Sequence, residues 1–364
     1  MDRRLFLTAA ASLAALPSNA NAAASSPIEE VITSTEFSGS VLVAQGRKIV
    51  LRKGFGLADR SFETPCGPDT AYRIASITKL MTATLVMQLV EAGRIDLDQP
   101  IRTYIADYKG PAAGQVTVRQ LLNHSSGIEN FDKGLTSYAD AAARGMPAYQ
   151  LPHRPRALMD QFASGPLVNP PGAAFDYNNA DYVILGQIIE AVEGDSYEAV
   201  LSRRVLAPPG LKSTGMAKHA GVVARLAPTY YKDEAAPLAN DMPVYPENWY
   251  AAGGLYSTCD DLLAFSNALY GGRLMSAGSL KALLTPGLDE YGFGLWVSEL
   301  EVDGRKHRFA QRPGRIMGAN TLLLRMLDDD VTIIILGNTN LMDTDRLGFR
   351  LARRVLGSEQ AASS

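Results

Sequence analysis

The chain has 364 residues, which is enough for one large domain with a sizeable core or for two interleaved domains. Hydrophobic residues make up 46% of it and charged residues 20%, as in ordinary globular proteins. A formal net charge of -3 gives no electrostatic basis for binding nucleic acid or a membrane surface, so neither is an expected partner. The chain has only four histidines, and its two cysteines, Cys66 and Cys259, lie far apart. We therefore expect no metal, no cofactor and two free thiols, although an oxidising compartment would permit a bridge.

The first 24 residues have the features of an export signal. Arg3 and Arg4 precede a short alanine-rich apolar run that ends at Leu16, and residues 20–22 (Ala-Asn-Ala) offer a cleavage site. Paired arginines are typical of twin-arginine signals, which export folded proteins. The run is too short to span a bilayer permanently. We expect a signal peptide at 1–24, a periplasmic mature protein and no remaining membrane span; an uncleaved anchor is the alternative.

Strands are predicted near the start of the mature chain. The β-branched runs at 39–43 and 48–52 flank residues 45–47 and predict a hairpin. From Ser76 to about 92, apolar residues recur at steps of three and four, and Gly93 follows where a helix stop is expected. This segment is apolar on much of its surface, which predicts a buried central helix.

The middle of the chain consists of short helical patterns among loops rich in proline and glycine. Clear helical patterns occupy 182–192, about 260–270 and 346–356. β-rich runs return at 293–297, 321–327 and 331–336.

Strands at both ends and helices between them predict an α+β fold. We expect one antiparallel sheet built from both chain ends and flanked by helices, with an inserted all-helical domain. Residues 25–364 then form a single domain, with an α/β part of about 28–75 and 251–364 and a helical part of about 76–250.

Ser76 and Lys79 form an S-x-x-K pattern at the start of the predicted central helix. Residues three apart on a helix share a face, so the two side chains should be neighbours. A serine hydroxyl becomes a good nucleophile when a base takes its proton, and a lysine with a lowered pKa can be that base. The helix N-terminus also favours negative charge that develops at Ser76. Alone, the pattern is weak, because it recurs by chance and more often describes an N-cap serine and a solvated lysine.

Tyr177 and Asn179 lie just before the predicted helix at 182–192. A tyrosine beside cationic side chains has a lowered pKa and can relay protons. An asparagine side chain can donate to a substrate carbonyl while it accepts from a lysine. Alone, this pattern describes a turn followed by a helix cap.

Arg312, Gly314 and Arg315 lie in a basic segment before the last two predicted strands. A glycine at 314 would let a substrate approach the backbone closely. The backbone N–H of Arg315 could then form an oxyanion hole together with the N–H of Ser76. Alone, this segment describes a basic loop between strands.

Together the three patterns resemble the serine β-lactamase and penicillin-binding protein superfamily, which carries S-x-x-K, then Y-x-N or S-x-N, then K-T-G or H-x-G. The closest resemblance is to class C β-lactamases and their relatives among D-Ala-D-Ala carboxypeptidases, D-aminopeptidases and β-lactamase-fold esterases. It extends over roughly 38–336, because further segments are similar to the family: 72–76 (YRIAS), 121–128 (LLNHSSGI), 171–179, 253–258 (GGLYST) and 291–296 (YGFGLW).

The resemblance implies roles for individual residues. Ser76 is the nucleophile, and Lys79 and Tyr177 share the general base and acid roles. His124 belongs to a structural segment rather than to a Ser-His pair. The implied substrate-binding residues are Asn179, Arg312, Gly314 and Arg315.

The third pattern departs from the family, which has lysine or histidine where this chain has Arg312. Arginine keeps a positive charge for an acidic substrate group but cannot cycle a proton. Pro313 removes a hydroxyl and a backbone donor. These changes leave acylation of Ser76 intact but disfavour efficient β-lactam hydrolysis. His307 is a rival for the position of Arg312.

The sequence therefore predicts an exported serine hydrolase that cleaves an ester or amide carbonyl of a small molecule through an acyl-enzyme on Ser76. An esterase and a D-amino-acid peptidase are equally expected, and a β-lactamase less so. The alternative is a penicillin-binding or sensing protein that acylates with little turnover, or a catalytically silent protein of this fold.

Overall fold

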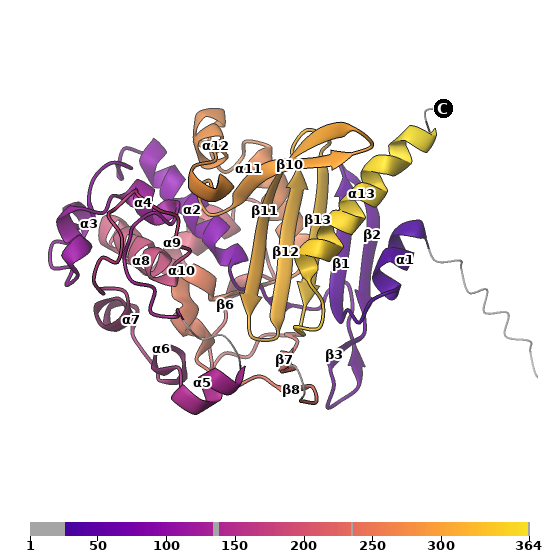
Figure 1. Ribbon diagram of the computed structural model, residues 1–364, viewed down its shortest axis with the longest axis horizontal. Coiled ribbons are helices and arrows are strands. Elements are labelled where there is room, and N and C mark those ends of the chain that lie inside the picture. The colour runs from indigo at the N-terminus through magenta and orange to yellow at the C-terminus, as the bar shows by residue number, and fades with distance from the viewer. Residues whose placement is uncertain (1–25, 134–137, 234–235, 363–364) are drawn as a thin grey trace, which may run out of the picture.

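The computed structural model describes residues 26–133, 138–233 and 236–362, so the predicted signal peptide at 1–24 lies outside the described residues. A six-stranded antiparallel sheet forms one half of the molecule, and helices gather in the other half (Figure 1). The strand order is β10-β11-β12-β13-β1-β2. The bounds are β1 Gly39–Gln45, β2 Lys48–Phe55, β10 Trp296–Val302, β11 Arg305–Ile316, β12 Ala319–Met326 and β13 Val331–Gly337.

The sheet joins the two ends of the chain, as the sequence predicts. β1 and β2 form the expected hairpin, and β1 also pairs with β13, from Gly39 opposite Gly337 to Gln45 opposite Val331. The α+β class is therefore confirmed, with one antiparallel sheet built from strands at both ends.

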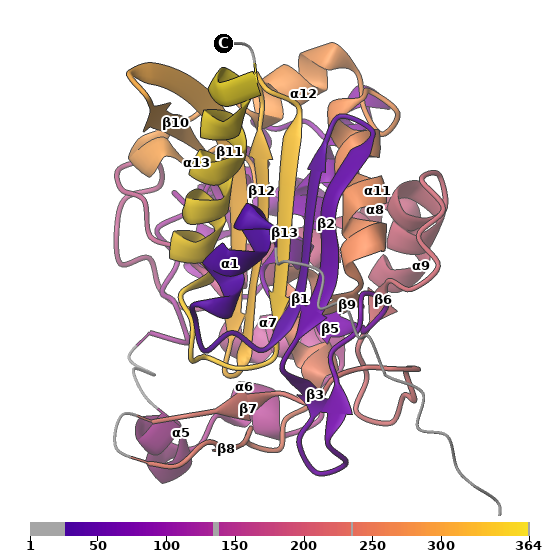
Figure 2. The same cartoon turned by 90° about the vertical axis from the view of Figure 1, so that its right-hand side faces the viewer.

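Both faces of the sheet are covered. On β13, Ile333 and Ile335 enter a core with α1 (Pro27–Thr33) and α13 (Thr344–Ala362), and Figure 2 shows these two helices together on one face. Ile334 and Leu336 enter the core that contains α2 (Ile77–Glu91) and α11 (Cys259–Tyr270). Successive strand side chains point to opposite faces, so a continuous apolar strand is buried on both sides.

The predicted central helix is α2. Its side chains are buried around nearly the whole circumference, because apolar residues occur on all of its faces. Ala75, just before the helix, has a φ of 47°. This left-handed conformation is unusual for alanine and turns the chain into the helix beside Ser76, where backbone strain is typical of functional sites.

The segment between the two parts of the sheet contains most of the helices, joined by loops. The helix predicted at 182–192 is α8, Asn179–Glu193. Two-residue strands also occur in this segment, and the sequence analysis did not predict them. The remaining elements are β3 Leu57–Asp59, β4 Thr64–Pro65, β5 Tyr72–Arg73, α3 Ile101–Tyr104, α4 Val118–Leu122, α5 Tyr138–Arg144, α6 Pro147–Gln150, α7 Pro155–Phe162, α9 Tyr197–Leu201, β6 Gly215–Met216, β7 Tyr230–Tyr231, β8 Ala239–Asn240, α10 Tyr250–Gly253, β9 Leu255–Ser257 and α12 Ala277–Leu283.

The third sequence pattern lies inside a strand. β11 carries Arg312, Gly314 and Arg315. The sequence analysis placed them correctly before the last two strands but predicted no strand over these residues. β10 also begins and ends later than the run predicted at 293–297. The site residues of β11 are therefore held by ladder hydrogen bonds rather than by a loop.

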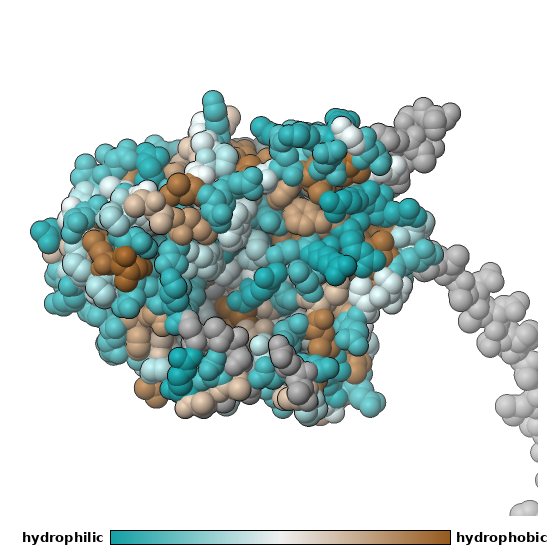
Figure 3. Space-filling view, in the orientation of Figure 1, coloured by the Kyte–Doolittle hydropathy of each residue, from teal (hydrophilic) through white to brown (hydrophobic). Residues whose placement is uncertain are grey.

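The surface agrees with the globular composition. On the face seen in Figure 3, hydrophobic residues form small patches among hydrophilic ones. Within the described ranges, no helix has the length and apolar character needed to cross a membrane. Cys66 and Cys259 are free and buried, as expected.

Candidate active site

Ser76 and Lys79 are neighbours at the start of α2, as their spacing predicts. Lys79 Nζ lies 3.3 Å from Ser76 Oγ. Lys79 is fully buried and Ser76 is 8% exposed. Nζ also donates to Asn179 Oδ1 at 2.6 Å and to the carbonyl oxygen of Ala252 at 2.8 Å. Three oxygen atoms therefore surround the lysine nitrogen.

Tyr177 contacts Ser76 from a second direction. Its hydroxyl donates to Ser76 Oγ at 2.8 Å and accepts a hydrogen bond from Arg312 Nη2. Arg312 Nε donates to the Ser76 carbonyl oxygen at 2.7 Å, and Nη1 donates to the Tyr291 hydroxyl at 3.1 Å. The fold thus brings all three sequence patterns into one site.

The pKa values of the two proton-handling groups shift toward neutrality. Burial lowers the pKa of Lys79 and the charge of Arg312 lowers it further, to about 8, although Tyr177 and Asp132 oppose the shift. Burial raises the pKa of Tyr177, but the charges of Arg312 and Lys79 outweigh burial and lower it to about 8. Both groups can therefore exchange protons near neutral pH, and Arg312 is the shared source of positive potential.

Arg312 makes its contacts within the site. It is 1% exposed, and its guanidinium lies 5.2 Å from the Tyr177 ring centre and 5.3 Å from the Trp296 ring centre. Its hydrogen bonds go to Ser76, Tyr177 and Tyr291. The sequence analysis expected it to bind an acidic group of the substrate; that contact stays a prediction.

β11 also presents backbone groups to the site. Its pairing with β10 ends at Gln311, which leaves one edge of the following residues open. Pro313 has no N–H, so β11 tolerates it where its nitrogen faces this open edge. Backbone groups alternate along a strand, so the Arg315 N–H faces the same edge. This direction supports the predicted oxyanion hole, which stays a prediction.

The Arg315 side chain points away from Ser76. It pairs with Asp345 at 2.8 Å and with Asp343 at 3.4 Å. Its predicted contribution to substrate binding therefore rests on its backbone N–H and not on its charge.

Gly314 lets β11 pack directly on the turn before α2. A Cβ at this position would lie 2.5 Å from the Ile74 carbonyl oxygen, 2.5 Å from Thr321 Oγ1 and 3.0 Å from the Ser76 nitrogen. The close approach seen in the structure is thus between two segments of the protein's own chain, and a close approach by substrate stays a prediction.

Gly314→Ala should separate β11 from Ser76. We expect the free energy of unfolding to fall by roughly 1–3 kcal/mol. We also expect a loss of hydrolysis, because the N–H groups of the predicted oxyanion hole move apart. Thermal unfolding and kcat/KM measure the two effects. Gly278→Ala is the matched control, because its Cβ would meet only Ser276 Oγ, at 3.7 Å. Equal stability of the two variants would contradict this account of Gly314.

Two histidines make no hydrogen bond to Ser76 Oγ within the part of the chain that the structure describes. His124 Nδ1 is 2.9 Å from Asp181 Oδ2, both side chains are fully buried, and the His124 ring packs 4.5 Å from the Tyr177 ring. Burial lowers the pKa of His124 and raises that of Asp181, which favours the neutral forms. His307 lies earlier on β11 and contacts Asp329 at 2.9 Å, so Arg312 and not His307 occupies the position beside Ser76.

The sequence analysis did not single out three residues that the structure brings to the site. Trp296 stacks on Tyr177 with ring centres 6.0 Å apart, and Tyr291 accepts from Arg312. Both belong to the family-like segment 291–296, which was a usable signal. Asp132 accepts from Asn179 Nδ2 at 2.5 Å, and no sequence pattern marked it.

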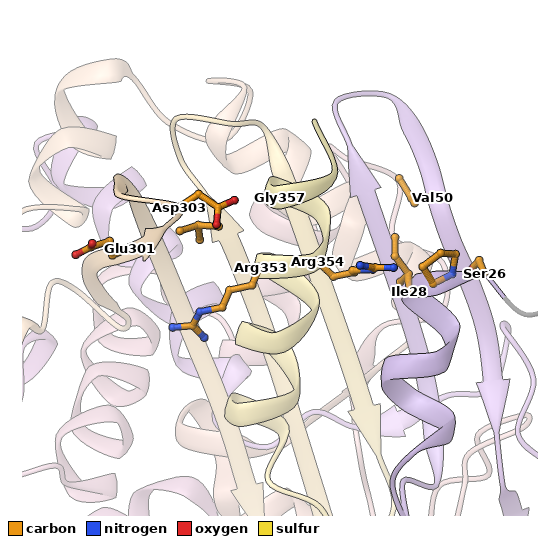
Figure 4. A pocket seen from close by; sticks show the side chains of 10 residues that line it. Ser26, Ile28, Val50, Glu301, Asp303, Arg353, Arg354 and Gly357 are labelled. Atoms are coloured by element: carbon orange, nitrogen blue, oxygen red, sulfur yellow. The ribbon is translucent and has the colours of Figure 1, made fainter. Parts of the chain in front are cut away.

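A groove of about 840 Å³ lies on the other face of the sheet, between α1, α13 and β10 (Figure 4). Its lining includes Glu301, Asp303, Arg353 and Arg354. The sheet separates it from Ser76, so it is no part of the site. In the part of the chain that the structure describes, no group of three or more acidic, histidine or cysteine side chains is arranged to hold a metal ion.

Solved structures with the same fold define the class. A penicillin-binding protein from Bacillus halodurans is 25% identical with a TM-score of 0.76, covering 91% of this chain and 99% of that chain. D-amino acid amidase from Ochrobactrum anthropi SV3, complexed with D-phenylalanine, is 25% identical with a TM-score of 0.75, covering 91% and 98%. A D-stereospecific amidohydrolase from Streptomyces sp. is 27% identical with a TM-score of 0.72, covering 86% and 93%. The fold is that of the penicillin-binding protein and amidase class of serine hydrolases.

The family model described as Beta-lactamase matches residues 30–356, and the chain therefore belongs to this family. Putative penicillin-binding protein PbpX of Bacillus subtilis (strain 168) is 28% identical over 272 residues, which are 72% of this chain and 62% of that protein. Penicillin-binding protein 4* of the same organism is 27% identical over 328 residues, 83% of this chain and 68% of that protein. The chain thus spans less than two thirds of PbpX. The family resemblance inferred from the sequence is confirmed.

Proposed function

We propose that the chain is an exported serine hydrolase that cleaves an ester or amide carbonyl of a small molecule through an acyl-enzyme on Ser76. The observation that carries this proposal is the position of Ser76 Oγ, 3.3 Å from Lys79 Nζ and 2.8 Å from the Tyr177 hydroxyl. Both partners have a pKa of about 8. Export rests on the signal-like pattern of residues 1–24.

Acylation begins with the loss of the Ser76 proton to the pair formed by Lys79 and Tyr177. Ser76 Oγ bonds to the carbonyl carbon, and the carbonyl oxygen takes up negative charge between the backbone N–H groups of Ser76 and Arg315. When the intermediate collapses, the bond to the leaving oxygen or nitrogen breaks and the pair returns the proton to that atom. A water molecule then attacks the acyl carbon, the pair accepts its proton, and Ser76 leaves with a proton restored.

The substrate proposed here is an ester or an amide rather than a β-lactam. Arg312 stands where the family has lysine or histidine, and Pro313 removes a hydroxyl and a backbone donor, so efficient β-lactam hydrolysis is disfavoured. The named amidase and amidohydrolase neighbours support amide cleavage. An esterase or a D-amino-acid peptidase is therefore favoured over an efficient β-lactamase.

The test is to incubate the protein with a p-nitrophenyl ester, a chromogenic cephalosporin and a D-Ala-D-Ala peptide, and to record turnover and intact mass. We expect turnover of the ester or the peptide, with its loss in Ser76→Ala because no nucleophile remains. A lasting adduct without turnover would support the penicillin-binding or sensing alternative. If none of the three compounds gives turnover or an adduct, this result contradicts both the hydrolase proposal and the penicillin-binding or sensing alternative.

A further inference from the structure

Asp132 is connected to Lys79 through a single amide side chain. Asp132 Oδ2 accepts from Asn179 Nδ2 at 2.5 Å, and Asn179 Oδ1 accepts from Lys79 Nζ at 2.6 Å. The same Asp132 oxygen accepts from the Tyr149 hydroxyl at 2.7 Å. Tyr149 stacks on Trp249 with ring centres 4.2 Å apart and planes 10° apart. The carboxylate is thus anchored on one side by a packed aromatic pair and contacts the site on the other.

The carboxylate determines which way the Asn179 amide faces. Burial raises the pKa of Asp132, while the hydrogen bonds from Tyr149 and Asn179 and the charge of Lys79 oppose this rise. In its ionised form the carboxylate only accepts hydrogen bonds, whereas an amide has one accepting and one donating end. The donating Nδ2 must therefore face Asp132, and the accepting Oδ1 must face Lys79. A reversed amide would set two oxygen atoms against each other at Asp132, which is unfavourable in a buried site.

This orientation has its main effect when Lys79 is neutral. A neutral amine has two N–H groups and one lone pair. Asn179 Oδ1 at 2.6 Å and the Ala252 carbonyl oxygen at 2.8 Å accept the two hydrogens. The third hydrogen bond of Nζ is to Ser76 Oγ at 3.3 Å, and the Tyr177 hydroxyl also interacts with Nζ. We infer that the lone pair of the neutral amine faces Ser76 Oγ. With the Asn179 amide reversed, Nδ2 would donate to that lone pair and block the base.

We propose that Asp132 is a positioning residue for the general base: it fixes the Asn179 amide and thereby aims the lone pair of neutral Lys79 at Ser76 Oγ. The inference rests on the proposed function, because it assigns a role within the same site. The charged and titratable groups that shift the pKa of Lys79 are Tyr177, Arg312 and Asp132. The pair His124 and Asp181 lies beyond them and interacts with Lys79 through its charge. The groups that interact electrostatically with Asp132 are Lys79 and Tyr149.

Asp132→Asn is the sharpest variant, because an asparagine at 132 can donate as well as accept and so permits both orientations of Asn179. We expect kcat/KM for p-nitrophenyl acetate to fall roughly 10- to 100-fold. The negative charge of Asp132 raises the pKa of Lys79, so its loss lowers that pKa. Lys79 must be deprotonated to act, and the acid limb of the pH profile should therefore move to lower pH.

The matched control is Asp261→Asn. Asp261 Oδ2 also accepts two hydrogen bonds, at 2.7 Å from the Ser213 N–H and at 2.8 Å from the Thr214 hydroxyl, but outside the site. We expect its pH profile to match the wild type. Asp132→Glu, which keeps an accepting carboxylate, should recover part of the rate. A merely structural role of Asp132 would lower the rate of both Asp132 variants without moving the acid limb, and this result would overturn the inference.

A second measurement separates this inference from the proposed function. The rate at which a fluorophosphonate probe labels Ser76, followed by intact mass, reports the reactivity of the serine without any turnover. We expect labelling of the wild type, none of Ser76→Ala and a slowing of roughly 10- to 100-fold in Asp132→Asn. An unreactive wild type would overturn the proposed function and the inference with it. A reactive wild type with an equally reactive Asp132→Asn would overturn the inference alone.

Discussion

Lys79→Met is expected to lower kcat/KM by roughly 10²- to 10⁴-fold, the usual contribution of a general base. Methionine is unbranched like lysine and fills the buried space, but it cannot accept the Ser76 proton. The change also leaves Asn179 Oδ1 and the Ala252 carbonyl oxygen without the donor that both have in the native site. Steady-state hydrolysis of a p-nitrophenyl ester measures the loss, and thermal unfolding shows whether the variant is folded.

Lys218→Met is the matched control for this substitution. Lys218 pairs with Glu198 at 2.6 Å, and both side chains are about half exposed. Surface ion pairs of this kind contribute little to stability, so the control should retain the wild-type rate. A folded Lys79→Met variant that hydrolyses the ester as fast as this control would refute the assignment of Lys79 as base.

Arg312→Gln should move the pH profile as well as lower the rate. The charge of Arg312 lowers the pKa of Lys79 and of Tyr177, so its removal raises both pKa values. A base works in its deprotonated form, and the acid limb of kcat/KM should therefore move to higher pH. Each unit of such a shift lowers the rate about tenfold below the limb. Activity at pH 7 should fall most, and part of it should return at alkaline pH.

Two comparisons separate the charge of Arg312 from its shape. Arg312→Lys keeps the charge and should leave the acid limb closer to that of the wild type. Arg325→Gln removes a guanidinium from the neighbouring strand β12, where it lies 5.4 Å from the Tyr270 ring centre, and should leave the limb in place. If Arg312→Gln lowers the rate at every pH equally, Arg312 supports the site through packing alone.

The sequence predicts the frame of this fold well because its core elements contain continuous apolar runs. Strands β1, β12 and β13 and the helix α2 are buried along almost their whole length. Helix α8 was equally readable, although it begins at Asn179, three residues before the predicted start at Tyr182. Element boundaries depend on local caps, and here the Asn178 side chain caps the helix by accepting from the Ala180 N–H.

β11 was missed because its buried residues include polar ones. Arg312 is almost completely buried within the strand, and Gly314 and Pro313 are residues that usually interrupt strands. A search for alternating apolar residues therefore fails where the sheet contributes to the site. β11 departs from the apolar pattern because the buried cation Arg312 occupies a position where an apolar side chain is expected. The charge of Arg312 lowers the pKa of Lys79 and of Tyr177.

The sequence predicts those residues of the candidate site that occur in recognisable patterns. Ser76, Lys79, Tyr177 and Asn179 were all identified from spacing and resemblance, and the structure brings them together. Asp132 could not be identified, because its role depends on a contact across 47 residues that no local spacing records. The hydrogen-bond partners of Arg312 could not be predicted either, because the sequence does not show which oxygen atoms an arginine side chain will contact in the folded protein.

The pairing of the first strand with the last has a consequence for when the proposed active site can form. Ser76 is made early, but the Arg312 side chain that bonds its carbonyl oxygen follows 236 residues later. The second edge of β1 likewise stays unpaired until β13 has been synthesised and can pair with it. Contacts so distant along the chain close late in folding, because the intervening loop must first lose its entropy. On the proposed function, a growing chain on the ribosome would therefore carry Ser76 without the charge and the strand edge that activate it. We expect acyl transfer only after synthesis has reached the final strands.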